Sequence, residues 1–344
     1  MRDKLLGTLY GLAYGDAVGF ASLFHRFHVL PAKRHDFLFE TNKRLSRERI
    51  LPLALPFTHR QPEDTLSPAP TDDTEFAVFA AKTLAAIWPQ ITQEKLVAKW
   101  REDFGTHKEE IWTRFSERAA LDNFELGVFP PDSGNDNPLH YEDAAVSRAV
   151  GLALLFDNPA RAAEVAAMES SISQAEDGVW GAQAMAFAVS ALVGGGDLNE
   201  ALSGAELYFP ADSWIAEENR KAAGCAREAQ SDHDLPLLLA ESVINNVYSF
   251  GNAAPETVPA AFAIARRVAG VPLRGVLLAN SVAKAGDSLP AFVGAICGAA
   301  QGASSIGELW VKRLDGLRGV CLPFLGGTSL STVAEEIEEV RRQS

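Results

Sequence analysis

Helix-forming segments fill the chain from residue 143 to its end, and this run constrains the fold more than any other feature. The segments are rich in alanine, and glycine or proline breakers such as residues 194–196 and 326–327 separate them. We find no strand alternation and no repeat of fixed period. The predicted helices span residues 143–156, 159–171, 178–193, 197–207, 213–230, 235–249, 255–268, 272–284, 290–303, 304–315 and 331–342. The pattern predicts an all-α fold.

The first part of the chain is also helical, but two loops interrupt it. Helical spacing of apolar residues predicts helices over residues 3–20, 71–88, 93–104 and 109–121. In the last two, the expected core anchors are Trp100, Phe104, Ile111 and Trp112. Residues 24–70 are irregular and basic, and residues 127–141 are rich in turn formers. We predict one compact many-helix domain over residues 1–344, with two functional loops.

Composition limits the classes of partner. The 344 residues are 47% hydrophobic and carry a net charge of -14, which disfavours nucleic acid and anionic membranes as partners. Cys225, Cys297 and Cys321 are far apart and form no CxxC pair, which favours a reducing compartment. The start of the chain shows no secretory pattern, and residues 289–303 read as a buried helix. We therefore expect a soluble cytoplasmic protein with a small-molecule partner; an oligomer is left open.

The stretch from Pro70 to Glu75 carries two hydroxyls and three carboxylates at the start of a predicted helix. One interpretation is a helix cap, with Asp72 at the N-cap and Glu75 completing a capping box. Adjacent carboxylates repel one another, however, and a hard divalent cation such as Mg²⁺ binds both carboxylate and hydroxyl oxygens. The residues alone slightly favour the cap, and the metal site stays the alternative.

Four glycines recur at intervals of four in the first helix, at Gly7, Gly11, Gly15 and Gly19. Each glycine lowers helix stability relative to alanine, so the repeat indicates that another backbone or a ligand approaches this face. Close helix packing is the preferred interpretation. Asp16 is the one acidic residue within this face of small residues.

A second acid and hydroxyl pair, Asp287-Ser288, precedes another predicted buried helix. On its own the pair is best explained as an N-cap, with Pro290 close to the first helical position.

Taken together, these motifs resemble the ADP-ribosylglycohydrolase family, which includes dinitrogenase reductase-activating glycohydrolase and the J1 crystallins. The resemblance covers roughly residues 4–315. It rests on Gly-Asp-Ala at residues 15–17, Thr-Asp-Asp-Thr at 71–74, Ser-Gly-Asn at 133–135 and Gly-Asp-Ser at 286–288. It implies an all-α fold of that type, in which metal ions hold the ribose hydroxyls and position a water at the anomeric carbon. The metal ligands implied are Thr71, Asp72, Asp73 and Asp287.

The chain departs from the family pattern at the second metal motif. Relatives normally read Gly-Asp-Thr-Asp-Thr there, whereas Leu289 and Pro290 follow Ser288 in this chain. Their side chains cannot bind a metal, so we expect one Mg²⁺, while the second of the usual two lacks these ligands and stays open. The candidate catalytic residues are Asp73, together with Asp16 and Asp136 as candidates for the missing acid/base function. The candidate substrate-binding residues are Asn135, His140, Asn246, Ser249, Asn252 and Ser288.

The resemblance implies a hydrolase that cleaves a ribosyl N- or O-glycosidic bond, acting on an ADP-ribosylated or smaller ribosylated substrate. Nearby carboxylates would stabilise the oxocarbenium character of the transition state. One alternative is a nucleoside-type N-ribohydrolase. The alternative from another class is a non-catalytic, crystallin-like member that has lost part of the metal site, which the residues Leu289 and Pro290 favour.

Overall fold

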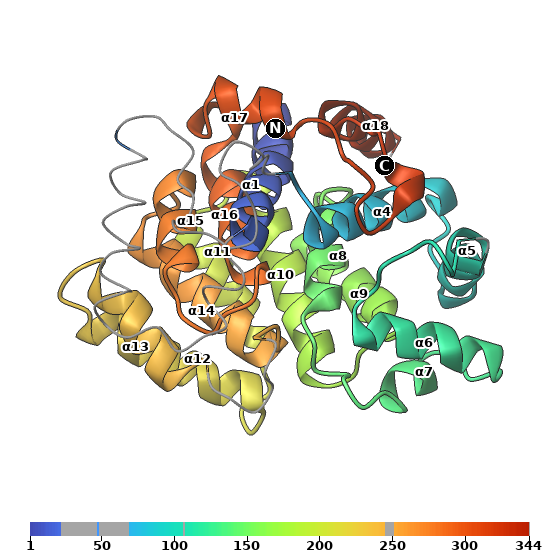
Figure 1. Ribbon diagram of the computed structural model, residues 1–344, viewed down its shortest axis with the longest axis horizontal. Helices are drawn as coiled ribbons and strands as arrows, with labels where there is room; N and C mark the ends of the chain where they lie inside the picture. The colour runs from blue at the N-terminus through green and yellow to red at the C-terminus, as the bar shows by residue number, and fades with distance from the viewer. Residues whose placement is uncertain (22–46, 48–68, 106, 245–250, 344) are drawn as a thin grey trace.

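The computed structural model describes residues 1–21, 47, 69–105, 107–244 and 251–343, and in these residues the regular structure is helical (Figure 1). The predicted loop over residues 24–70 lies almost entirely outside the described residues. The first helices are α1 (Arg2–Ala21), α4 (Asp72–Ile87), α5 (Gln93–Gly105), α6 (Phe115–Glu125), α7 (Asp132–Asn135), α8 (Ala144–Ala153), α9 (Pro159–Ser170), α10 (Asp177–Val193) and α11 (Leu198–Ala205). They are followed by α12 (Trp214–Glu228), α13 (Asp234–Ser242), α14 (Ala254–Arg267), α15 (Pro272–Asn280), α16 (Ser288–Gln301), α17 (Glu308–Leu314) and α18 (Leu330–Arg342).

Helices α1 and α16 are packed backbone to backbone, and the glycine repeat makes this possible. A Cβ atom added at Gly11 would lie 2.1 Å from the carbonyl oxygen of Gly294, and one at Gly7 would lie 2.3 Å from that of Gly298. At Gly15 the nearest atom would be the Pro290 oxygen, at 2.0 Å. The structure thus confirms close helix packing as the reason for the repeat.

Helix α4 lies beside α1 and packs along α8, again through a glycine. A Cβ atom at Gly151 of α8 would lie 1.8 Å from the Ala77 oxygen of α4. On the face of α4 toward α5, the buried Phe79 contacts the rings of Trp100 and Phe104. These contacts position α4, and three of the predicted metal ligands, Thr71, Asp72 and Asp73, lie at its start.

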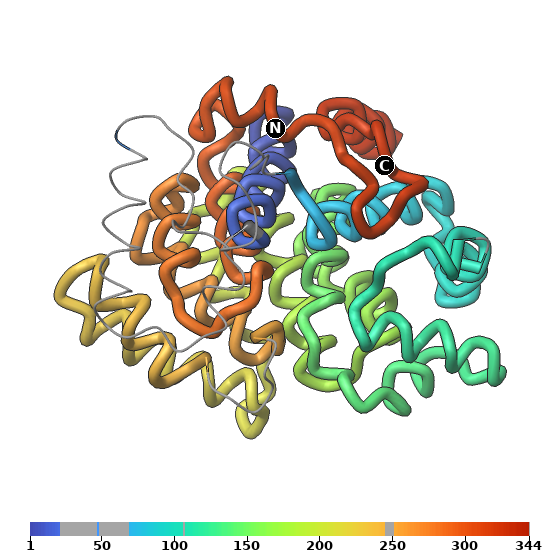
Figure 2. The backbone as a smooth tube through the Cα atoms, viewed as in Figure 1, coloured from blue at the N-terminus to red at the C-terminus, as the bar shows by residue number. Residues whose placement is uncertain are grey.

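The C-terminal helix α18 closes the fold against α1 and α4, so both ends of the chain lie on the same side of the molecule (Figure 2). Val333 and Ile337 are buried on its inner face. Arg2 near the start of α1 forms ion pairs with Glu335 and Glu338. Docking on the chain's own core, which the apolar stripe of this helix predicts, is what the structure shows.

Most predicted helices are confirmed to within a few residues, and two differences matter. The helix predicted over 109–121 begins only at Phe115, because the preceding residues form turns and extended chain. Trp112, expected in the core, is 76% exposed as a result. The helix predicted over 235–249 ends at Ser242. Among the described residues, no helix combines the length and apolar character needed to cross a membrane.

Candidate active site and metal centre

Asp16 joins α1 to the first turn of α4. Its carboxylate is fully buried and accepts four hydrogen bonds from that turn. The backbone N–H groups of Thr71 and Thr74 donate to Oδ2 at 2.7 and 3.1 Å, and the hydroxyls of the same residues donate at 2.5 and 2.6 Å. Burial, with the nearby charges of Asp73 and Asp72, raises the pKa of Asp16 well above its ordinary value. Asp16 therefore caps α4 from a different helix.

This contact corrects the predicted capping box of Asp72 and Glu75. The N-cap residue is Thr71, and it makes no capping hydrogen bond of its own. The Glu75 carboxylate points instead to the segment after α17, where it accepts from the backbone N–H groups of Val320, Cys321 and Leu322 at 2.7–2.8 Å. The prediction was wrong because tertiary donors compete successfully for Glu75.

The guanidinium of Arg114 lies between the carboxylates at the start of α4. Its Nε donates to Asp72 Oδ2 at 2.9 Å, and its Nη2 donates to Asp73 Oδ1 at 2.8 Å. Nη1 pairs with Asp143, the N-cap residue of α8, and Nη2 also donates to Ser288 Oγ at 3.0 Å. One arginine thus connects the starts of α4, α8 and α16.

The electrostatics of the site follow from burial and from this arginine. Burial raises the pKa of Asp73 to about 6, although the charge of Arg114 acts in the opposite direction. Burial also raises the pKa of Asp143, again opposed by Arg114. For Arg114 burial opposes the charged form, but the carboxylates of Asp72, Asp73 and Asp143 outweigh it and raise the pKa. The cluster is a largely buried set of acids that a single positive charge, that of Arg114, stabilises.

The residues that position Arg114 are themselves buried. Arg114 is the N-cap of α6, and its backbone N–H donates to Glu117 at 3.1 Å. Glu117 also accepts from Arg148 at 2.6 Å, and the backbone N–H of Ser116 donates to Glu142 at 2.9 Å. The start of α6 is therefore held on two sides, which fixes the point from which the Arg114 side chain extends.

Three carboxylates of the site could hold a metal ion. One oxygen each from Asp16, Asp72 and Asp73 lie within 4.8 Å of one another. Asp73 Oδ2 is buried and has no hydrogen-bond partner among the described residues. Carboxylate and hydroxyl oxygens are the donors that hard divalent cations prefer. The donor set thus fits a divalent cation, although Arg114 contacts two of its three members.

The second predicted acid motif also contacts Arg114, because Nη2 donates to both Asp73 and Ser288. Asp287 is the N-cap of α16 and is half-buried, and its charge contributes to the raised pKa of Arg114. Ser288 Oγ lies 3.3 Å from Asp143 Oδ1. Leu289 and Pro290 are buried in the packing of α16, where Pro290 meets Gly15. The structure brings Asp287 and Ser288 to the cluster through Arg114.

The predicted loop residues lie elsewhere. Asn135 and Asp136 are exposed at the end of α7, and none of the side-chain contacts among the described residues joins them to the acidic cluster. A ring nitrogen of His140 lies 3.0 Å from the Asn137 oxygen, and the other lies 3.8 Å from Glu176. Asn137 is buried and donates to two backbone oxygens, those of Ser116 and Ser173. The roles of Asn135, Asp136 and His140 stay predictions.

The asparagine segment before α14 is described only in part. Asn246 and Ser249 lie outside the described residues. The backbone oxygen of Asn252 accepts from the Asp143 N–H at 2.9 Å, and the Gly251 oxygen accepts from the Gly286 N–H at 2.6 Å. Asn252 Oδ1 is buried without a partner among the described residues. Asn252 therefore borders both the cluster and the second acid motif.

The structure adds four residues that the sequence did not single out. Arg114 and Asp143 are described above. Ser147 of α8 donates to Asp73 Oδ1, and Thr257 of α14 donates to Asp143 Oδ2 at 2.9 Å. Asp143 is the first residue of the helix predicted over residues 143–156, so it carried a recognisable signal. Arg114 fell inside a segment read as helix, which concealed it.

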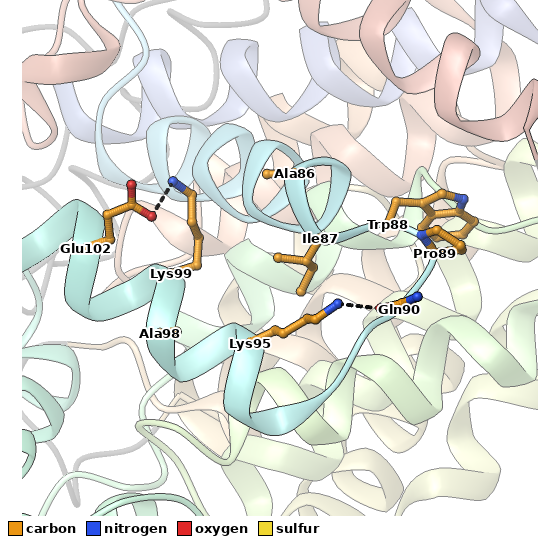
Figure 3. A pocket seen from close by; sticks show the side chains of 9 residues that line it. All are labelled: Ala86, Ile87, Trp88, Pro89, Gln90, Lys95, Ala98, Lys99 and Glu102. Atoms are coloured by element: carbon orange, nitrogen blue, oxygen red, sulfur yellow. Dashed lines mark hydrogen bonds and ion pairs between the residues drawn. The ribbon is translucent and has the colours of Figure 1, made fainter.

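A surface hollow of about 500 Å³ lies at the other end of α4, between that end and α5 (Figure 3). Lys95 donates to Gln90 and Lys99 to Glu102 at its wall. At 1.5 Å per residue the hollow is about 22 Å along α4 from the acidic cluster. None of its nine lining residues is a predicted site residue.

Comparisons with known proteins agree with the fold and the motifs. A family model described as ADP-ribosylglycohydrolase matches residues 1–344. A solved structure described as an ADP-ribosylglycohydrolase-related protein complex is similar with a TM-score of 0.64 and 20% sequence identity. That match covers 99% of this chain and 98% of the other, and at this identity it shows a shared fold. No curated protein sequence matches the chain.

Proposed function

Since this chain belongs to the ADP-ribosylglycohydrolase family, we propose that it hydrolyses an N- or O-glycosidic bond to ribose, with one Mg²⁺ held by Asp16, Asp72 and Asp73. The observation that carries the proposal is the unpartnered Oδ2 of Asp73. This oxygen is fully buried, yet no described residue donates to it. An oxygen left in this state is stabilised by a cation, a water or a substrate hydroxyl.

The proposed reaction breaks the bond between the anomeric carbon and the leaving group and adds water at that carbon. A bound divalent ion would supply positive charge for the ribose hydroxyls and lower the pKa of water. Asp73 accepts the proton of the attacking water at Oδ2 and later releases it to solvent, and the leaving group takes up one proton from solvent as it departs. The negative charges of Asp72 and Asp143 lie close to the same point and stabilise the positive charge that develops on the ribose ring.

The proposed substrate is an ADP-ribosylated group or a smaller ribosylated base. The test is release of ADP-ribose from an ADP-ribosylated protein, and of ribose from nucleosides, followed by chromatography with Mg²⁺ or with a chelator. Turnover that Asp73→Asn lowers by a factor of about 100 or more supports the proposal. Glu164→Gln is the control, because Glu164 is exposed and pairs with Arg161 on the surface.

The outcomes separate the proposal from its rivals. Turnover of nucleosides alone favours the N-ribohydrolase. Binding of ADP-ribose without turnover of any ribosylated compound contradicts the hydrolase. That result favours the non-catalytic member, for which the close pairing of Arg114 with Asp72 and Asp73 is the specific observation.

A further inference from the structure

The acidic cluster already contains a cation, the guanidinium of Arg114. Its side chain is 11% exposed and pairs with Asp72 at 2.9 Å, with Asp73 at 2.8 Å and with Asp143. Three carboxylates around one guanidinium give this point of the site a positive centre without any metal. Guanidinium groups suit such a position, because several donors lie in one fixed plane.

Buried hydrogen bonds and ion pairs hold the backbone of Arg114 in place. The backbone of Arg114 is bonded to Glu117, which is buried and pairs with the buried Arg148. Arg148 in turn pairs with Glu169 at 2.7 Å and lies over the ring of Trp100. An exposed arginine that met the acids by chance would have no such support.

Arg114 and a divalent ion would need the same carboxylates. The metal candidates include Asp72 and Asp73, and the guanidinium contacts one oxygen of each. Two cations on the same pair of carboxylates repel each other strongly in a buried site. A metal could still bind the remaining oxygen of each carboxylate, such as Asp73 Oδ2, but the positive guanidinium beside it would weaken that binding.

We propose that Arg114 is a built-in competitor of the divalent metal: it supplies a counter-charge to Asp72, Asp73 and Asp143 when no metal is bound, and it weakens metal binding by the same contacts. The proposal rests on the metal site of the proposed function. It predicts a protein that is folded without metal and binds divalent ions weakly.

Metal affinity in variants of Arg114 tests this competition, with Mn²⁺ as the probe. Free Mn²⁺ is measured by electron paramagnetic resonance, and the melting temperature is measured with a chelator and with increasing Mn²⁺. We expect Arg114→Gln to melt at a lower temperature without metal, because three carboxylates, of which Asp73 and Asp143 are fully buried, lose their counter-charge. We expect the same variant to bind Mn²⁺ about tenfold more tightly than wild type, or better, because charged hydrogen bonds no longer compete.

Two further variants keep the test decisive. Arg118→Gln is the matched control on the same helix, because its side chain is 43% exposed and it pairs with Asp122 at 3.5 Å; its Mn²⁺ affinity should equal that of wild type. Arg114→Lys keeps the charge but cannot bridge three carboxylates, and it should tighten Mn²⁺ binding by a smaller factor. It replaces Arg114→Gln if the latter does not fold.

Equal Mn²⁺ affinity in wild type and both Arg114 variants overturns the proposal, as does weaker or absent binding in the variants. None of these measurements uses a substrate. A protein without hydrolase activity would therefore not contradict the competition between Arg114 and the metal. Equal Mn²⁺ affinities would contradict that competition and would leave the proposed hydrolysis to be tested by turnover.

Discussion

The carboxylate of Asp16 accepts two hydrogen bonds from Thr74, one from its backbone N–H at 3.1 Å and one from its hydroxyl at 2.6 Å. Asp16 of α1 thus supplies the hydrogen-bond acceptor that an N-cap side chain would supply to α4. The N-terminal N–H groups of a helix have no partner within the helix, so a buried helix start needs such an acceptor. In this chain the acceptor also lies within reach of a metal bound to Asp72 and Asp73.

Replacing Asp16 should destabilise the fold with no metal present. Asp16→Ala removes the acceptor of four buried hydrogen bonds, and we expect a loss of about 3 kcal/mol in the free energy of unfolding, measured with urea and a chelator. Asp16→Asn keeps one acceptor oxygen and should cost less. An Asp16→Ala protein as stable as wild type would mean that other contacts hold the start of α4.

Adding one methyl group between α1 and α16 should also be costly. In Gly11→Ala the new Cβ would lie 2.1 Å from a backbone oxygen of α16, so the two helices must separate. We expect a loss of about 3 kcal/mol in the free energy of unfolding, despite the better helix propensity of alanine.

The matched control for this substitution is Gly224→Ala in the middle of α12. The nearest atom to a Cβ there is the end of the Arg227 side chain, at 3.9 Å. With space available, the propensity of alanine should stabilise the protein by about 0.5 to 1 kcal/mol. Two substitutions of one kind should therefore change stability in opposite directions in thermal unfolding, and the same sign for both would contradict the packing argument.

The helices could be predicted from the sequence because their ends depend on neighbouring residues. Proline and glycine end helices through the geometry of their own backbone, so the end of α4 before Pro89 is readable from the residues beside it. The spacing of Gly7 to Gly19 likewise indicates a close neighbour before that neighbour is known. Trp112 shows the limit, because an apolar residue near a helix start is not thereby buried.

The candidate site was less predictable, because its contacts are long-range. Asp72 and Asp73 are recognisable in the sequence because they are adjacent acidic residues at a predicted helix start. Arg114 is separated from them by about forty residues, and its role depends on where α6 begins relative to α4. Glu75 has the spacing of a capping box, yet it binds a segment 245 residues or more away. Helical periodicity says nothing about which of several donors a carboxylate will meet.

We expect Glu75 to stabilise the fold and not to bind the metal. Glu75→Ala leaves three backbone N–H groups, at residues 320–322, without their acceptor, and we expect a loss of about 3 kcal/mol in urea unfolding. Mn²⁺ affinity per folded molecule should be unchanged. Glu164→Gln, on the surface of α9, should change stability by less than about 0.5 kcal/mol. A Glu75 variant that loses Mn²⁺ binding while keeping its stability would place Glu75 among the metal ligands.

Asp315 should make the docking of α18 depend on pH. Its carboxylate accepts from the Tyr10 hydroxyl at 2.6 Å, from Ser329 Oγ at 2.7 Å and from the Ser331 N–H at 2.9 Å. Burial opposes ionisation, but these hydrogen bonds outweigh it and lower the pKa of Asp315 from its ordinary 3.8. Because the pKa of Asp315 is lower in the folded state than in the unfolded state, its ionised form stabilises the fold at pH values above the unfolded-state pKa. This stability is lost as the pH falls through the folded-state pKa.

We therefore expect Asp315→Asn to be less stable than wild type by about 1 kcal/mol at neutral pH and at about pH 5, with the difference shrinking below about pH 3.5. The expected loss of stability is small because the Asp315 side chain is only half-buried. Urea unfolding at the three pH values measures it, with Asp212→Asn, an exposed residue, as the control for general acid effects. A difference that stays constant down to the lowest pH would show that Asp315 stabilises α18 by its shape and hydrogen bonds alone, and not by its charge.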